Sequence, residues 1–255
     1  MEYIKHFNQQ AERYRKFRPD YPDALFDYLL SLVGKNARVW DCATGNGQAA
    51  LSLAQRFKSV IATDINQAQL DDAFIHPSIE YRYGEAEYSG LPEHSINLIT
   101  VAQALHWFNF AAFYQETIRV LKPRGWIAVW CYSLGRVNPA VDKVIDRLYY
   151  QILGDNYWPK ERYFIGEAYE SIPFPFKKVD SPKFTIEKTM DLADFMGYLS
   201  TWSAVKEFEQ RNQPGSLALI ENELCQAWGV ETDKHLITWP IHLLMANRVD
   251  YTPRN

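Results

Sequence analysis

The chain has 255 residues, 47% of them hydrophobic and 15% aromatic, and its 27 Lys and Arg against 31 Asp and Glu give a net charge of −4. This composition excludes a disordered chain, and the absence of a basic run argues against nucleic-acid binding. No stretch approaches the roughly 18 uninterrupted apolar residues of a membrane span. The three cysteines show no metal-ligand spacing and suggest a reducing compartment. We expect a cytoplasmic globular protein that binds no metal, membrane or nucleic acid.

The first part of the chain predicts a strand–helix–strand unit. Pro22 and the spacing of apolar residues predict a helix over 22–33. The apolar runs over 37–41 and 59–64 predict two strands, separated by the loop CATGNG and a helix over about 47–57. Such a unit implies a parallel sheet with right-handed crossovers.

The alternation continues to about residue 133. Strands are predicted over 79–83, 96–101 and 126–131, with a helix over 110–121 that Asn109 could cap. The fold class is therefore α/β, with a doubly wound sheet.

Beyond residue 133 the alternation of strands and helices ends. A helix is predicted up to Gly154, followed by an irregular aromatic stretch over 155–176. Two helices, roughly 191–210 and 215–228, precede a final apolar run over 236–246. The aromatic stretch could cover a substrate or form a satellite core, and the sequence favours neither.

The loop from Asp41 to Gly47 is typical of a nucleoside site. Its glycines allow a sharp turn and a close approach to a ligand, and the following helix offers unpaired N–H groups. Asp64 ends the next strand, 19 residues after Gly45, where a carboxylate can accept hydrogen bonds from both ribose hydroxyls. A plain tight turn, with Asp41 capping the helix, is the alternative.

Two cofactors compete for this loop. Gly45-x-Gly47-x-x-Ala50 also satisfies the loose dinucleotide pattern, so an NAD(P)-dependent oxidoreductase is one hypothesis. Asp41, however, would repel a pyrophosphate. S-adenosylmethionine (SAM) has no phosphate, and its ammonium and sulfonium groups are attracted to a carboxylate. SAM therefore ranks ahead of NAD(P).

The ordered motifs resemble those of the class I (Rossmann-like) SAM-dependent methyltransferases. The loop resembles their motif acid-x-Gly-x-Gly-x-Gly, with Ala43 in place of the first glycine. Similar segments follow in the family's order: Gly84 to Glu87 with Leu91-Pro92, Ile96 to Ile99 (with Asn97 where the family usually has Asp), and Leu121 to Gly125. Together the matches cover residues 37 to 131.

A narrower resemblance lies outside these motifs. Arg18-Pro19-x-Tyr21-Pro22 and Ala104-x-His106-Trp107-Phe108 are similar to the trans-aconitate methyltransferase-like, or methyltransferase type 11, group, with Asn109 replacing a final acid. The resemblance implies a seven-stranded, mostly parallel sheet whose last strand is antiparallel, formed from about 179–187 and 236–246. It leaves the methyl acceptor open.

The expected division of the chain has four parts. Residues 1–34 form an N-terminal lid and helix, and 35–135 form the SAM-binding core. Residues 136–230 form an aromatic, helical substrate cover with a strand near 179–187, and 231–255 form the final strand and tail.

The resemblance assigns a role to each candidate residue. The methionine part of SAM is expected at Asp41, Gly45 and Gly47, the ribose at Asp64, and the adenine near Ile65, Glu85 and Ala86. Tyr14 and Ala43 complete the expected cofactor contacts, and Gln103 is expected to contact the cofactor where it borders the methyl group.

Three residues are candidates for the chemistry: His106, Trp107 and Arg18. His106 could act as a general base or simply line the pocket, because a carboxylate acceptor needs no base. Trp107 could wall the site or be a core aromatic. Arg18 could clamp a carboxylate or lie on the surface.

These inferences predict a SAM-dependent methyltransferase that acts on a small molecule, at an oxygen that could belong to a carboxylate. Methyl transfer by in-line displacement chiefly requires alignment and exclusion of water. Besides the oxidoreductase, the alternative is a catalytically silent SAM-binding regulator, suggested by Ala43, Asn97 and Asn109. The protein could be a monomer or a homodimer.

Overall fold

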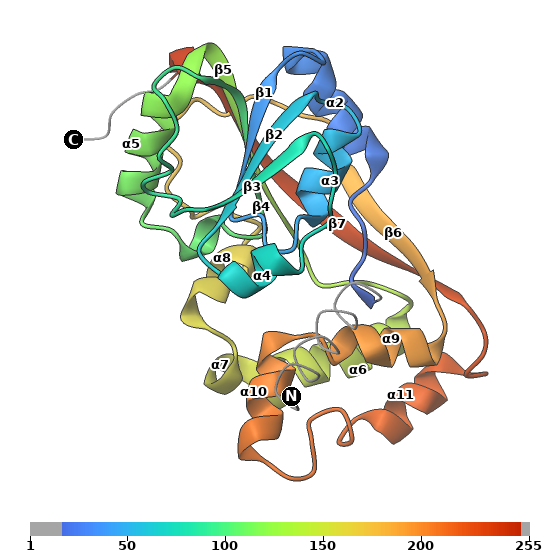
Figure 1. Ribbon diagram of the computed structural model, residues 1–255. Coiled ribbons are helices and arrows are strands. Elements are labelled where there is room, and N and C mark those ends of the chain that lie inside the picture. Colours follow the sequence, from blue (N-terminus) through green and yellow to red (C-terminus); the bar gives the residue numbers. More distant parts are fainter. Residues whose placement is uncertain (1–16, 251–255) are drawn as a thin grey trace. The chain divides into compact units, whose positions relative to one another are not determined.

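The computed structural model describes residues 17–250. Seven strands form one sheet in the order β3-β2-β1-β4-β5-β7-β6 (Figure 1). The strands are β1 (Arg38–Cys42), β2 (Ser59–Asp64), β3 (Ile79–Tyr83), β4 (Ile96–Ala102), β5 (Leu121–Tyr132), β6 (Phe184–Met190) and β7 (His235–Asn247). The pairs among β1 to β5 are parallel, and β7 pairs with β5 in the antiparallel sense. The predicted doubly wound, seven-stranded sheet with an antiparallel last strand is confirmed.

Helices lie on both faces of this sheet, α5 on one side and α2 and α3 on the other (Figure 1). Their bounds are α2 (Asp23–Val33), α3 (Gln48–Ala54), α4 (Gln67–Asp71) and α5 (Phe110–Val120). A 3₁₀ turn, η1 (Leu105–Trp107), follows β4, and η4 (Arg248–Asp250) follows β7. Asn109 caps α5 as predicted, because its side-chain oxygen accepts a hydrogen bond from Ala112 N.

The later helices follow the prediction up to residue 153 and depart from it beyond that point. They are α6 (Pro139–Asp146), a π-helix η2 (Arg147–Leu153), α7 (Gly154–Tyr157), η3 (Lys160–Arg162), α8 (Tyr163–Gly166), α9 (Leu192–Leu199), α10 (Ser203–Arg211) and α11 (Glu221–Trp228). The helix expected over 191–210 is wrong: it is interrupted between α9 and α10. There the hydroxyls of Ser200 and Thr201 donate to the carbonyls of Gly197 and Tyr198, and Trp202 is extended. Side-chain bonds of this kind compete with helical backbone bonds.

The chain forms two compact units. Within the described residues, the sheet unit comprises 21–133, 164–185 and 240–250, and the helical unit comprises 17–20, 134–163 and 186–239. The core of the sheet unit includes Ile165, Tyr169, Phe174 and Phe176, all at most 5% exposed. The second half of the aromatic stretch is therefore core of the sheet unit. In its first half, Trp158 packs against Tyr149 and Trp202 within the helical unit.

Candidate functional site

The glycine turn connects β1 to α3 at the carboxyl edge of the sheet. Thr44 N donates to Thr63 O (2.9 Å) and Gly45 N donates to Asp64 Oδ2 (2.8 Å), so the turn is tied to the end of β2. Ala43, Gly45 and Gly47 all have positive φ, at 55°, 58° and 83°. The left-handed backbone explains why glycine suits these positions. Ala43 adopts the same backbone despite its Cβ.

Asp41 lies beneath this turn and is 1% exposed. Its carboxylate accepts hydrogen bonds from the hydroxyls of Thr44 (2.5 Å) and Thr100 (2.7 Å). Burial raises the pKa of Asp41 to about 6, although the two hydroxyl bonds act in the opposite direction. Among residues 17–250, no Lys, Arg or His forms an ion pair with it. The site therefore contains a buried acid that lacks a cationic partner in the described part of the chain.

Asp64 stands at the end of the neighbouring strand. Besides accepting from Gly45 N, it accepts from Asn66 N (2.8 Å) through its other oxygen. A carboxylate oxygen has two lone pairs, so each of these oxygens can accept a further hydrogen bond. Asp64 thus orders the glycine turn and can still bind a ligand hydroxyl.

Tyr81 on β3 is a site residue that the sequence analysis missed. A Cβ on Gly47 would lie 2.1 Å from Tyr81 Oη and 2.9 Å from Cζ, so the tyrosine occupies the space that a side chain would need. Tyr81 Oη donates to Phe74 O (2.9 Å), which fixes the ring against the turn. Gly47 is therefore required by the packing of Tyr81, a contact that no local sequence signal could have shown.

Gln103 follows β4 directly and has a φ of 57°, an uncommon backbone for a non-glycine residue. Its N–H donates to Trp130 O (2.8 Å). The side-chain Oε1 is buried and has no hydrogen-bond partner in the described structure. A buried acceptor without a partner is rare in proteins, and a ligand donor would satisfy it.

His106 is 5% exposed, and its Nδ1 lies 2.8 Å from Tyr169 Oη. Ala168 and Tyr169 have φ values of 54° and 61°, so two successive non-glycine residues are strained. The fully buried Tyr169 ring and its bond to His106 hold this turn in place. Trp107 packs beside His106 with ring centroids 4.9 Å apart, but it is 56% exposed and is not a core aromatic.

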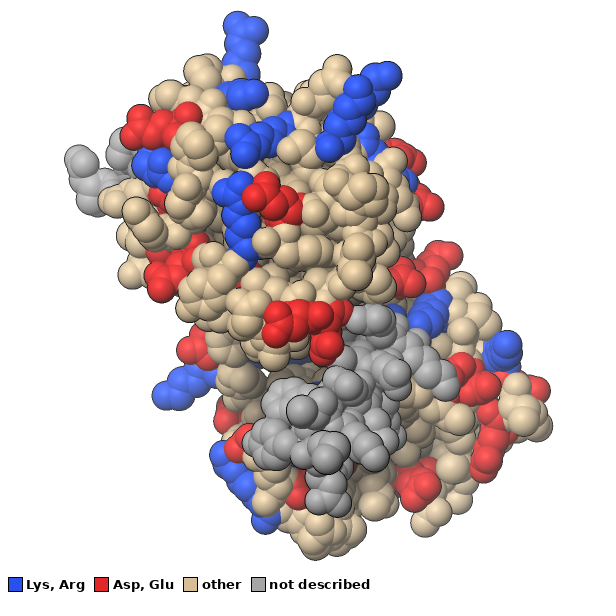
Figure 2. Space-filling model, in the orientation of Figure 1, with Lys and Arg blue, Asp and Glu red and all other residues tan. Residues whose placement is uncertain are grey.

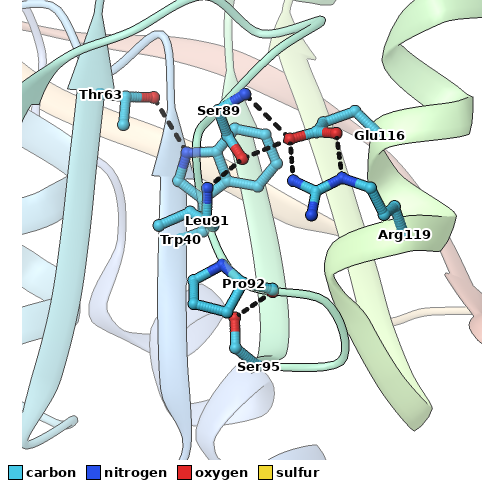
Figure 3. A network of polar contacts seen from close by, with 8 residues as sticks. All are labelled: Trp40, Thr63, Ser89, Leu91, Pro92, Ser95, Glu116 and Arg119. Carbon is cyan, nitrogen blue, oxygen red and sulfur yellow. Dashed lines mark hydrogen bonds and ion pairs between the residues drawn. The ribbon is translucent and has the colours of Figure 1, made fainter.

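The segment expected near the adenine is fastened to α5. Ser89 donates to Glu116 Oε1 through both its N–H (2.9 Å) and its hydroxyl (2.5 Å), and Arg119 binds Glu116 through two nitrogens, each at 2.7 Å (Figure 3). Glu87 accepts from Asn109 N (2.7 Å) at the start of the same helix. The sequence analysis did not single out Ser89 or Glu116.

The expected adenine residues differ in exposure. Ala86 is 7% exposed and belongs to the core, whereas Ile65 is 64% exposed and Glu85 is also exposed.

On the face shown in Figure 2, acidic and basic side chains are interspersed and most of the surface is uncharged.

Arg18 belongs to the helical unit. Its Nη2 donates to Thr201 O (3.4 Å), its guanidinium carbon lies 5.7 Å from the centre of the Tyr198 ring, and its carbonyl accepts from Lys188 Nζ (3.2 Å). These contacts fix the side chain at the end of α9. The other N-terminal candidate, Tyr14, lies outside the described residues.

Two of the altered motif positions have structural roles. Asn97 Oδ1 accepts from Arg38 N (3.0 Å) and from Lys122 Nζ (3.1 Å), near the amino ends of β1 and β4. Asn109 caps α5. None of these hydrogen bonds involves the glycine turn.

Comparisons with known proteins agree with this geometry. A family model described as a methyltransferase domain matches residues 40–129. A protein of Dictyostelium discoideum named as a methyltransferase is 34% identical over 248 residues, which cover 95% of this chain and 94% of that protein. The chain belongs to the class I SAM-dependent methyltransferases.

Solved structures extend the comparison. A protein from Anaeromyxobacter dehalogenans, named a type II methyltransferase, is 39% identical to this methyltransferase and superimposes with a TM-score of 0.85, covering 91% of this chain and 98% of that one. A methyltransferase from an antibiotic biosynthesis pathway of Anabaena variabilis has a TM-score of 0.54 at 16% identity over 88% of this chain and 98% of that one, and it shares the fold alone.

Family membership leaves the oxidoreductase hypothesis without support, since the relatives are named as methyltransferases. Within residues 17–250, the methyltransferase has no helix long and apolar enough to cross a membrane.

Proposed function

We propose that this methyltransferase binds SAM at the glycine turn and transfers its methyl group to an oxygen of a small molecule. The assignment of SAM as the cofactor rests on Asp41. A buried carboxylate without a cationic partner is unfavourable, and a cationic ligand would supply the missing charge. A pyrophosphate at the same place would be repelled.

The residues around Asp41 fit the remaining parts of such a ligand. Asp64 has lone pairs left for ribose hydroxyls, and Gln103 offers a buried acceptor without a partner. Among residues 17–250, a Cβ added at Gly45 would meet only Gln69 Oε1, at 3.8 Å, so the described part of the chain leaves the turn open there. When bound, SAM supplies an electrophilic methyl group on a sulfonium. The chain's task is then to orient the acceptor and to exclude water.

His106 and Trp107 are proposed to border the methyl group, since both follow β4 at the carboxyl edge of the sheet. Ile65, Glu85 and Ala86 are proposed to lie along the adenine. Arg18 remains a proposed clamp for a carboxylate of the cofactor or of the substrate, and Tyr14 remains a proposed cofactor contact. A small-molecule acceptor, a cytoplasmic location and a monomeric or dimeric state complete the proposal.

Calorimetric titration with S-adenosylhomocysteine (SAH), with NADH in parallel, tests the cofactor assignment. We expect micromolar binding of SAH alone. Asp64→Ala should weaken SAH binding at least about tenfold, or 1.4 kcal/mol. Asp71→Ala, at an exposed acid on α4, should leave binding unchanged and serves as the matched control.

Several outcomes would contradict parts of the proposal. Binding of NADH alone would overturn the assignment of Asp41, and unchanged binding by Asp64→Ala would overturn the ribose assignment. If SAH binds but labelled SAM methylates nothing among small acids, alcohols and phenols, the silent-regulator alternative gains support. Thermal unfolding of Asp64→Ala should be measured as well, because Asp64 also orders Gly45.

A further inference from the structure

A serine and a histidine form a hydrogen-bonded pair near the end of β5. Ser133 is the first residue after that strand, and its hydroxyl contacts His242 Nε2 on β7. In the antiparallel register Cys131 lies opposite His242, and Ser133 N donates to Pro240 O (3.1 Å). Because side chains alternate along a strand, Ser133 and His242 project from the same face of the sheet.

The pair lies on the edge of the sheet that holds the proposed cofactor site. The glycine turn follows β1, Gln103 follows β4 and Ser133 follows β5, and these three strands are adjacent in the sheet. Ligands of open α/β sheets bind at this carboxyl edge. Gln103 N bonds to Trp130 O, three residues before Ser133, so Ser133 lies about 10 Å farther along β5. This distance along β5 suits a residue that contacts the methyl acceptor.

An acid that follows the strained turn at Ala168 and Tyr169 acts on this pair through its charge. Tyr169 reaches His106, and the next residue, Glu170, is exposed and acts electrostatically on His242. Burial lowers the pKa of His242 below its ordinary value, and the Glu170 carboxylate partly opposes that effect. His242 is therefore neutral at pH 7 and can accept a proton, and Glu170 would stabilise the imidazolium that results.

His106 is less suited to that task. It is 5% exposed and its Nδ1 is engaged by a buried tyrosine, which favours a positioning role. His242 is half-buried, so a proton taken up there can pass to solvent.

We propose that Ser133 and His242, assisted by the charge of Glu170, remove the proton of an acceptor hydroxyl during methyl transfer, so that the acceptor is an alcohol or a phenol rather than a carboxylic acid. This inference rests on the proposed function. A carboxylate acceptor is already ionised at neutral pH and would need no such group.

The acceptor oxygen forms a bond to the methyl carbon while the bond from that carbon to sulfur breaks, and the sulfonium becomes a neutral thioether. The acceptor's proton passes to Ser133 Oγ as the serine's own proton passes to His242 Nε2. The imidazolium then loses its proton to solvent.

The test compares the wild type with His242→Gln, Ser133→Ala and Glu170→Gln. His235→Gln is the matched control, since His235 lies on the same strand but bonds to Trp228 O (3.2 Å). Each protein is incubated with labelled SAM and two panels, one of alcohols and phenols and one of carboxylic acids, and SAH affinity is measured by calorimetry. We expect turnover of hydroxyl compounds by the wild type and the control. His242→Gln and Ser133→Ala should lower kcat about 100-fold or more, with SAH affinity unchanged.

The pH profile separates a chemical role from a structural one. Because Glu170 raises the pKa of His242, Glu170→Gln should move the acidic limb of kcat to lower pH. An unmoved limb, undiminished turnover by His242→Gln, turnover confined to carboxylic acids, or no hydroxyl turnover by an enzyme that binds SAH would each overturn the inference. Failure of the wild type to bind SAH would instead overturn the proposed function.

Discussion

Two buried acids of the sheet unit, Asp41 and Glu116, have opposite environments. Glu116 is 6% exposed and is surrounded by donors: two nitrogens of Arg119, and the N–H and hydroxyl of Ser89. Asp41 is 1% exposed, and among residues 17–250 its carboxylate accepts hydrogen bonds from the hydroxyls of Thr44 and Thr100 alone. Within the described part of the chain, Glu116 has a cationic partner and Asp41 has none.

The pKa values follow from this difference. Burial raises the pKa of Glu116, but the bonds from Arg119 and Ser89 outweigh it, and the pKa lies below its ordinary value. Burial dominates at Asp41 and raises the pKa to about 6. A carboxylate with a built-in cation stabilises the fold, whereas one without a cation is poised for a charged ligand. Glu116 therefore stabilises the fold, and we propose that Asp41 binds the charged ligand.

The largest effect is expected for Glu116→Ala. Removing one partner of a buried, hydrogen-bonded ion pair lowers the free energy of unfolding by about 3–5 kcal/mol. Because the Arg119 side chain is 32% exposed, we expect a loss of about 3 kcal/mol here. Urea unfolding measures the loss. Glu207→Ala, which breaks the exposed pair with Arg211, should change stability by less than about 1 kcal/mol. Equal effects of the two variants would contradict the structural role of Glu116.

The contribution of Glu116 to stability is also expected to depend on pH. Because the folded pKa of Glu116 is lowered, its contribution is present above the unfolded pKa and is lost as the pH falls through the folded pKa. The stability difference between wild type and Glu116→Ala should therefore shrink in acid.

Gly47→Ala is expected to destabilise the protein by about 2–3 kcal/mol, because the new methyl group overlaps Tyr81 and the backbone is left-handed. In a Tyr81→Leu background the overlap is removed, and the same change should cost only about 1 kcal/mol. Thermal or urea unfolding of the four proteins forms a double-mutant cycle. Equal costs in both backgrounds would show that Tyr81 is not the reason for this glycine.

Asp41→Asn should have opposite effects on binding and on stability. SAH affinity should fall about tenfold to 100-fold, because the counter-charge for the ligand's ammonium is lost. At pH 8 the unliganded variant should be at least as stable as the wild type, since a buried charge is removed. Calorimetry and urea unfolding measure the two effects.

The sign of the pH effect at Asp41 is the reverse of that at Glu116. The folded pKa of Asp41 lies above the unfolded value, so the stability conferred by its protonated form is complete below about pH 4 and is lost as the pH rises through 6. Asp41→Asn should therefore gain on the wild type over this range. A constant difference between the two proteins would contradict the raised pKa.

The smallest effect is expected for Ala43→Gly. Relief of the left-handed backbone should offset the greater entropy of glycine in the unfolded chain, giving a change between zero and about 1 kcal/mol of stabilisation. In the exposed α5 position, Ala111→Gly should instead destabilise the protein by about 0.5–1 kcal/mol. Destabilisation of similar size by both changes would show that Ala43 is unstrained.

The sequence by itself determined the sheet and the part of the candidate site that lies at the ends of β1 and β2. Strand runs, the glycine turn and the acids at positions 41 and 64 are local patterns, and a parallel βαβ unit necessarily brings the ends of β1 and β2 together. The backbone bond from Gly45 to Asp64 follows from that arrangement. The helix cap at Asn109 could be predicted for the same reason, because it depends on residues close to each other in the sequence.

Only the tertiary structure decided which distant side chains meet. Ser89 and Glu116 are 27 residues apart, His106 and Tyr169 are 63 apart, and Ser133 and His242 are 109 apart. Hydrogen bonds across such separations leave no periodicity in the sequence, because they depend on strand register and on how a loop packs. The same holds for Tyr81 against Gly47 and for the Arg18 contacts. Periodicity reports which side of an element is buried, and packing alone chooses the partner.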